Sequence, residues 1–259
     1  MIQSLYTAAN TLSTMQSGID TIAHNIANME ATGYKRVRMD FKEALYARMA
    51  SPADNSPAMN LQRGAGALVG QTLRIFNQGP MQSTERLLDL YLEGGGFLTV
   101  AMPDGTQSYT RNGALYVSLS GQEAYLTDAH GYYILDENGQ RIAVDGHPES
   151  LVIGEDGTLS WVAEGDGESW PFARLGLVMF DNPSGLQATQ DGFFVPTANS
   201  GAARGDTGTA VRQGYLEGSN VDLAEETTRL IRTQRAFQLA SRAINTADQM
   251  MQLANTIRA

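Results

Sequence analysis

Apolar side chains recur at seven-residue steps along the first thirty residues of the chain. The series consists of Leu5, Leu12, Ile19 and Ile26. This spacing predicts an amphipathic helix that carries the seam of a coiled coil. The residues around the seam are mostly Thr, Ser, Asn and Gln, which are mediocre helix formers, so we expect the helix to need a partner helix in water.

The other end of the chain carries a matching pattern. Its seven-residue series is Leu223, Leu230, Phe237, Ile244 and Met251, flanked by the small residues Ala240 and Ala247. A second flank holds Ala236, Ala243, Met250 and Ile257. Such a stripe is wide enough for more than one neighbouring helix, and its small residues allow close approach.

A helix start signal precedes this second stripe. Asp222 can cap the helix, with Glu225 three residues further on, which is a variant of the capping box. No Gly or Pro follows before Arg258, so one helix of about 35 residues is predicted. We therefore expect the two terminal helices to pair as a coiled coil.

Between the helical ends, short β-type runs alternate with turn signals. These signals include Pro103-Asp104-Gly105, Asn138-Gly139, Asp145-Gly146 and Asp156-Gly157. Turns at intervals of about 8–12 residues are typical of an antiparallel sheet. A stretch rich in Pro, Ala, Gly and Asn, from Ser51 to Gly70, suits a connector or an extended loop.

The predicted fold class is therefore α+β, with a central antiparallel all-β domain between the paired terminal helices. Residues 1–45 and 216–259 are assigned to a terminal-helix coiled-coil domain. Residues 46–75 are assigned to a connector or extended loop, and residues 76–215 to a β-rich outer domain.

Composition narrows the possible functions. The chain has 259 residues, 18 Lys and Arg against 28 Asp and Glu, and a net charge of -10, which disfavours nucleic acid and anionic membranes as partners. There is no cysteine, which excludes disulfides and thiolate chemistry. The first residues do not read as a Sec signal and no 18-residue apolar stretch occurs, so no membrane insertion is expected.

Candidate catalytic and metal-binding groups are sparse. His24, His130 and His147 do not fit a recognised metal motif, and several Asp residues stand before Gly, where a turn requires them. The glycines between Gly64 and Gly70 lack the strand and helix of a nucleotide-binding loop. We therefore predict no catalytic residues, no cofactor and no metal, although a glycosidase-like carboxylate pair stays open.

Two further features have alternative interpretations. Trp161, Trp170 and the pair Tyr132-Tyr133 could form a carbohydrate platform, but aromatic residues in short strands more often fill a core. The basic residues Lys35, Arg36 and Arg38 are interpreted as a solvated turn at the end of the first helix. In this acidic chain they could also meet an acidic face of an adjacent subunit.

Three longer motifs together resemble the flagellar axial proteins of the rod and hook. They are AHNIANMEATGYKR at 23–36, GPMQSTERLLDLYLEGGGFLTV at 79–100, and QGYLEGSNVDLAEETTRLIRTQRAFQLASRAINTADQMM at 213–251. Within that family, QRAF at 234–237, DQMM at 248–251, YTRNG at 109–113 and the connector length look most like the distal-rod type. LEGSN at 216–220 suits the proximal-rod type equally, and Tyr91 and Glu93 depart from the usual pattern.

The resemblance implies a structural subunit that polymerises helically into a hollow shaft and transmits motor torque to the hook. Implied partners are further copies of the chain, other rod and hook proteins and the surrounding basal-body rings. The implied location is the basal body in the cell envelope, reached by flagellar type III export without a cleaved signal. The assembly interface would include the two seams with Asn25, Asn28, Gly33 and Tyr34. A proximal-rod or other hook-basal-body relative, or a secreted carbohydrate-binding β protein, are the alternatives.

Overall fold

The computed structural model describes residues 2–45, 47–48, 62–64, 66–120, 123–144, 150–162, 169–189 and 192–258. The chain divides into two compact units. The helical unit comprises residues 1–27, 37–74 and 222–259, and the β unit comprises residues 28–36 and 75–221. Each unit is therefore assembled from stretches that are far apart in the sequence.

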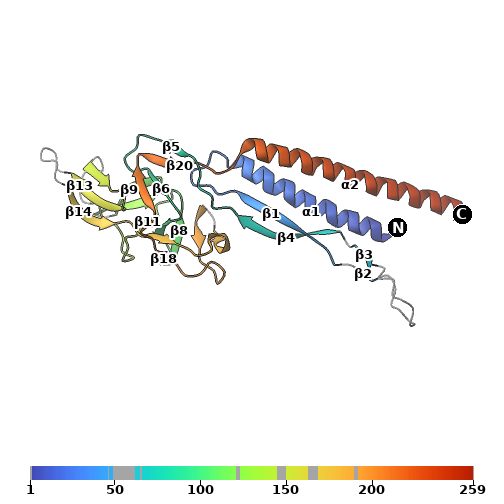
Figure 1. Ribbon diagram of the computed structural model, residues 1–259, viewed down its shortest axis with the longest axis horizontal. Coiled ribbons are helices and arrows are strands. Elements are labelled where there is room, and N and C mark those ends of the chain that lie inside the picture. Colours follow the sequence, from blue (N-terminus) through green and yellow to red (C-terminus); the bar gives the residue numbers. More distant parts are fainter. Residues whose placement is uncertain are drawn as a thin grey trace. The chain divides into compact units, whose positions relative to one another are not determined.

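The helical unit is built on two long helices that lie side by side (Figure 1). They are α1 (Ile2–Ala27) and α2 (Leu223–Arg258). Asn25 contacts Glu226, and a Cβ added at Gly18 would lie 3.8 Å from Thr233, so the helices run in opposite directions. Strands β1 (Val37–Glu43) and β4 (Ala67–Arg74) form an antiparallel hairpin in the same unit. The short strands β2 (Ala47–Arg48) and β3 (Gln62–Arg63) continue it.

Local sequence explains where α2 begins and how α1 tolerates its polar residues. Asp222 Oδ1 accepts hydrogen bonds from the backbone N–H groups of Ala224 and Glu225, at 2.8 and 3.2 Å, which confirms the predicted cap. In α1, the Thr14 hydroxyl donates to Asn10 O at 2.7 Å. Thr11, Ser17 and Thr21 likewise bond a carbonyl one turn earlier, and Thr14 also donates to Ala67 O at 3.0 Å on β4.

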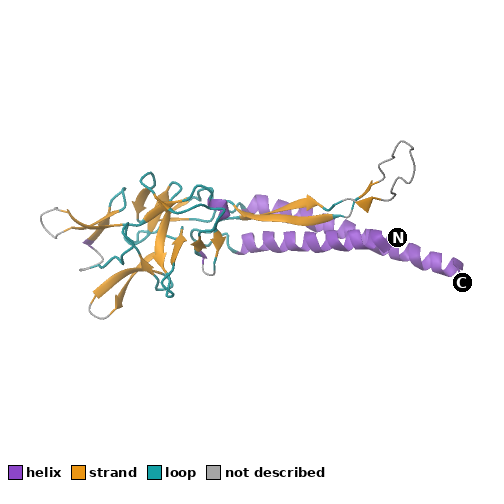
Figure 2. Cartoon of the chain, turned by 90° about the horizontal axis from the view of Figure 1, so that it is seen from below, coloured by secondary structure: helices purple, strands orange, loops and turns teal. Residues whose placement is uncertain are grey.

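The β unit is made of antiparallel strands (Figure 2). They are β5 (Met81–Ser83), β6 (Leu90–Glu93), β7 (Phe97–Ala101), β8 (Gln107–Thr110), β9 (Leu115–Ser120), β10 (Glu123–Asp128), β11 (Tyr133–Ile134), β12 (Leu151–Ile153), β13 (Thr158–Val162), β14 (Ser169–Arg174), β15 (Leu177–Met179), β16 (Gln187–Ala188), β17 (Phe194–Val195), β18 (Arg204–Gly205), β19 (Ala210–Gln213) and β20 (Tyr215–Glu217). A 3-10 turn, η2 (Pro183–Gly185), lies between β15 and β16.

The largest sheet has the order β16-β17-β8-β7-β11-β10-β9, with β15 paired to β7 and to β18. A three-stranded sheet has the order β12-β13-β14, and β19 pairs with β6 while β20 pairs with β5. The last two pairings matter for the site, because they join residues 210–217, which precede α2 in the sequence, to strands β5 and β6. The predicted α+β class with a central antiparallel sheet is confirmed.

Apolar side chains from these sheets form two core clusters. The larger contains fully buried leucines such as Leu98, Leu115 and Leu126. The smaller is aromatic, with Phe97 in edge-to-face contact with Phe76, Phe180 and Phe194 at centroid distances of 5.5, 5.6 and 5.9 Å. The core that supports the site therefore belongs to the β unit itself.

Predicted turns are observed where the structure describes them. Asp104 and Asp156 each accept a bond from the backbone N–H two residues on, and Gly105 and Gly157 have φ values of 80° and 81°. These positive φ values explain why Gly follows Asp. The turn at 145–146 lies outside the described residues, as do residues 49–61 of the expected connector.

Candidate assembly site

The face of α2 that meets α1 lies beside the predicted series Leu223, Leu230, Phe237, Ile244 and Met251. Glu226 and Thr233, which contact α1, are followed at the same seven-residue step by Ala240 and Ala247, both half-buried. Beside them, a second half-buried series consists of Leu230, Phe237, Ile244 and Met251. Leu12, Ile19 and Ile26 of α1 are likewise half-buried. Leu223 is 44% exposed, and the side chain of Leu5 lies outside the described residues.

Asn25 connects three elements of the helical unit. Its Nδ2 donates to Val37 O at 2.8 Å, and its Oδ1 accepts from Val37 N at 3.0 Å, so the side chain pairs with the first residue of β1 as a strand would. The same Nδ2 lies 3.4 Å from Glu226 Oε2 on α2. Asn25 and Glu226 are each 1% exposed. Asn25 therefore positions elements within one chain.

A face of α2 that includes Met250 of the second flank is left uncovered, and we call it the uncovered flank. Leu239, Met250 and Leu253 are 65%, 59% and 64% exposed. With about 3.6 residues per turn, these three side chains share one face, which differs from the face toward α1. Ala243 of the second flank is exposed and Ala236 is half-buried, while the side chain of Ile257 lies outside the described residues.

The remaining predicted residues, Asn28, Gly33 and Tyr34, belong to the β unit. Gly33 has φ +67°, and a Cβ added there would lie 2.9 Å from Asn112 N, so the close packing of this turn requires glycine. Gly33 N donates to Glu217 O at 2.7 Å, and Tyr34 O accepts from Asn220 N at 3.4 Å. The segment after α1 thus contacts the segment before α2.

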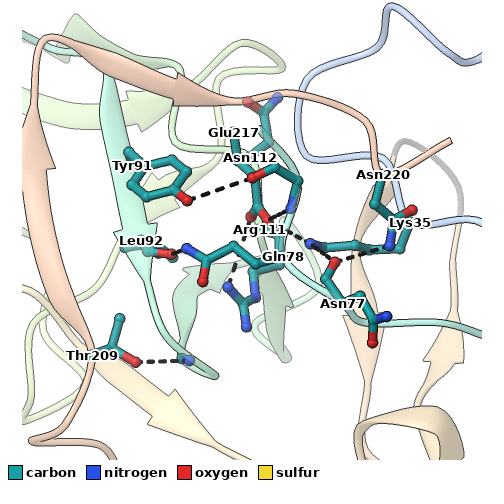
Figure 3. Close-up of polar contacts among 12 residues, drawn as sticks. Lys35, Asn77, Gln78, Tyr91, Leu92, Arg111, Asn112, Thr209, Glu217 and Asn220 are labelled. Atoms are coloured by element: carbon teal, nitrogen blue, oxygen red, sulfur yellow. Dashed lines mark hydrogen bonds and ion pairs between the residues drawn. The ribbon is translucent and has the colours of Figure 1, made fainter. Parts of the chain in front are cut away.

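A buried cluster of charged side chains lies at this junction (Figure 3). Lys35 Nζ donates to Glu217 Oε1 at 2.6 Å and to Asn77 O at 2.9 Å. Arg111 Nη1 lies 3.7 Å from Glu217 Oε2. Lys35 is 0% exposed, Glu217 1% and Arg111 3%. We call Lys35, Arg111 and Glu217 the clasp.

Neutral groups complete the surroundings of the clasp. Gly79 N donates to Glu217 Oε1 at 2.8 Å. Asn220 Oδ1 accepts from Arg36 N at 2.7 Å, while its Nδ2 donates to Ile75 O at 2.8 Å and Asn77 O at 2.9 Å. Asn220 therefore fastens the segment that follows α1 to the segment that precedes α2.

The clasp holds two cations and one anion away from water. Burial lowers the pKa of the Lys35 ammonium, Glu217 opposes this effect, and the Arg111 charge adds to it. Burial also lowers the pKa of the Arg111 guanidinium, which Glu217, Asp206 and Tyr91 oppose. The Glu217 carboxylate is therefore the group on which the charge balance of the site depends.

Lys35 was interpreted from the sequence as part of a solvated basic turn, and the structure shows that this is wrong. A lysine just after a helix usually points to water, and its acidic partner stands 182 residues away. The only available signal was that TGYK and LEGSN are both family motifs. Arg38, by contrast, is exposed and pairs with Asp40 at 2.9 Å.

Some of the aromatic residues considered for a carbohydrate platform lie against the core, and Trp170 does not. Tyr132 and Trp161 pack against the larger core cluster. Trp161 stacks on Phe172 with a centroid distance of 5.0 Å, whereas Trp170 is 62% exposed, so the core assignment is wrong for Trp170.

The described residues contain no group of three His, Asp or Glu side chains that could hold a metal ion, and His147 lies outside them. No described helix is both long and apolar enough to cross a bilayer.

The β unit is inserted in the sequence between two paired terminal helices, and the TGYK and LEGSN motifs are in contact within it. Three family models match the chain. They are "Flagella basal body rod protein" at residues 5–35, "Flagellar hook protein FlgE/F/G D1 domain" at 91–161 and "Flagellar basal body rod FlgEFG protein C-terminal" at 212–257.

Individual relatives agree with these matches along the whole chain. A flagellar basal-body rod protein FlgG from Borreliella burgdorferi is 36% identical over 100% of this chain and 99% of its own. FlgG from Bacillus subtilis is 34% identical over 97% of both chains. FlhP, a flagellar hook-basal body complex protein of the same organism, is 35% identical over 100% of both. The chain belongs to the flagellar basal-body rod protein family, FlgG type, and is a structural rod subunit located in the basal body.

The clasp predicts unequal effects of neutralising its members. Glu217→Gln keeps an oxygen for Gly79 N but leaves two buried cations without an anion, so we expect the free energy of unfolding to fall by about 3–5 kcal/mol. Lys35→Met leaves the Arg111–Glu217 pair and should cost less. Urea unfolding of the β unit measures both. Glu93→Gln, which breaks an exposed pair with Arg212 at 2.6 Å, is the control and should leave the free energy of unfolding almost unchanged. Equal losses at Lys35 and Glu217 would contradict this charge balance.

The lowered pKa of Lys35 gives a sign for the alkaline dependence of stability. Between that pKa and the ordinary lysine value of about 10.4, the unfolded chain binds the extra proton, so the contribution of Lys35 to stability rises with pH. Buried tyrosines such as Tyr91 and Tyr109, whose pKa values are raised by burial, act in the opposite sense. We therefore compare wild type with Lys35→Met by urea unfolding across this range. The difference should shift in favour of wild type as pH rises, and a flat difference would be inconsistent with a lowered Lys35 pKa.

Ala240 provides a test of the helix pair. Ala240→Leu adds three carbon atoms to the half-buried face toward α1, and overpacking typically costs about 1–3 kcal/mol. The helical unit should therefore melt at a lower temperature by circular dichroism. Ala243→Leu, on the exposed flank of the same helix, is the matched control and should leave melting unchanged. If both variants melt like wild type, Ala240 does not lie in a packed seam.

Proposed function

We propose that this chain is a distal-rod subunit that polymerises helically into a hollow shaft and transmits motor torque to the hook. A coiled coil is supported by two neighbouring pairs. Asn25 Nδ2 lies 3.4 Å from Glu226 Oε2, and a Cβ built at Gly18 would lie 3.8 Å from Thr233, seven residues away on both helices. Its partners would be further copies, other rod and hook proteins and the surrounding rings. Export through the flagellar type III pathway into the cell envelope, without a cleaved signal, belongs to the same proposal.

The observation that carries polymerisation is the uncovered flank of α2. Large apolar side chains exposed in a row on one helix face usually mark a site of protein association. Leu239, Met250 and Leu253 form such a row, and α1 already occupies a different face of α2. Contacts between unlike faces of identical subunits do not close on themselves, and they generate helical filaments.

The compact units suggest where the assembly domain ends. Residues 28–36 and 216–221 cluster with the β unit, whereas the β1–β4 hairpin clusters with the helices. We therefore place the inner tube on α1, α2 and this hairpin, and the outer domain on the β unit. The alternative, a proximal-rod or other hook-basal-body subunit, shares this architecture and differs in its position along the shaft.

Polar substitution of the uncovered flank tests the proposal. The triple variant Leu239→Gln, Met250→Gln and Leu253→Gln keeps good helix formers at exposed positions, so the monomer should fold normally by circular dichroism. It should fail to form filaments in electron micrographs of concentrated protein. It should also not restore swimming to a strain that has become non-motile because its own copy of the gene is deleted.

Leu119→Gln is the control, because Leu119 is 78% exposed but lies on β9 of the other unit. This variant should assemble and restore swimming. Normal filaments from the triple variant would exclude the flank as the assembly contact. A persistent wild-type monomer that binds sugars would favour the carbohydrate-binding alternative over the rod proposal.

A further inference from the structure

The clasp lies where two distant stretches of chain are held together. Residues 28–36 leave α1, residues 217–220 lead to α2, and Lys35 and Glu217 are separated by 182 positions. Gly33 and Arg36 donate backbone hydrogen bonds to Glu217 O and Asn220 Oδ1. Each stretch therefore supplies part of the surface on which the other rests.

The contact between these two stretches depends on the charges that are buried with it. Arg111 follows β8 and lies with its guanidinium carbon 4.8 Å from the centroid of Phe97, so the β core places it without help from the chain ends. Docking Lys35 beside it adds a second buried cation. Without a carboxylate, that arrangement carries a large desolvation and repulsion cost.

Glu217 supplies the missing carboxylate. It accepts from Lys35 Nζ and Gly79 N through Oε1, and it faces Arg111 through Oε2. Asp206 and Tyr91 also act on Arg111 electrostatically, but neither replaces the 2.6 Å contact with Lys35. The ammonium of Lys35 thus has its carboxylate only after residue 217 has docked.

We propose that Glu217 is a latch that makes docking of residues 28–36 and docking of residues 217–220 onto the β unit a single coupled event. In a chain that lacks residues 217–220, residues 28–36 stay undocked, because Lys35 and Arg111 repel one another in the buried site. The latch therefore distinguishes chains in which residue 217 has docked from chains in which it has not. This inference concerns the isolated chain and does not depend on polymerisation.

Amide hydrogen exchange on the full-length monomer tests the coupling. In Glu217→Gln, we expect Gly33, Arg36 and Gly218 to exchange faster together by about tenfold or more, because the segments open as one unit. Leu126 N, which donates to Ile142 O at 3.0 Å in the sheet, should stay better protected than these three amides, because it opens only when the β unit unfolds as a whole. Lys35→Met combined with Glu217→Gln should recover much of the lost protection, because it removes one of the two buried cations.

Matched controls separate a latch from general weakening. Glu93→Gln applies the same change to a surface carboxylate and should leave Gly33 and Gly218 unchanged. The proposal is overturned if Gly33 stays protected in Glu217→Gln while Gly218 opens, or if the double variant exchanges as fast as Glu217→Gln. If Glu217→Gln also exposes Leu126, the double variant decides, since recovery supports the latch and absence of recovery overturns it.

Discussion

The docking of residues 28–36 against residues 217–220 in the β unit depends on the burial of one carboxylate between two cations. The segment after α1 reads NMEATGYKR, which contains too few apolar side chains to dock by hydrophobic burial. Its attachment relies on hydrogen bonds and on the ion pair of Lys35 with Glu217. Buried ion pairs add little net stability, because desolvation offsets their attraction. What this pair contributes is selectivity, since Lys35 is compatible with its buried position only when a carboxylate is present.

Close backbone approaches give the clasp its geometry. A Cβ added at Gly79 would lie 1.9 Å from Gly218 O, and one added at Gly113 would lie 1.9 Å from Leu90 O. Together with Gly33, these glycines allow backbone segments to approach one another closely, because no Cβ stands between them. The glycines of the sequence motifs therefore have a steric role, and they bring the charged side chains within reach of one another.

The sequence predicted features whose causes are local. The cap at Asp222, the length of α2 and the turns at Asp104-Gly105 and Asp156-Gly157 follow from residues that lie a few positions apart, and the structure has each of these. The clasp could not be predicted in the same way, because Lys35 and Glu217 are distant and a lysine after a helix ordinarily faces water. The wide stripe on α2 likewise did not reveal which flank α1 covers, since the repeat fits both Ala240 and Met250.

Each of the three family matches contains one residue of the clasp. Lys35 lies in the match at 5–35, Arg111 in the match at 91–161 and Glu217 in the match at 212–257. Each matched segment thus contributes one charge to the same buried site. The exposed Trp170 and its neighbour Phe172 lie between the second and third matches. A joint that needs one residue from every segment constrains all three segments together. The stretch at 162–211 supplies none of Lys35, Arg111 and Glu217, and its Asp206 acts on the clasp only through its charge, by opposing the lowered pKa of Arg111.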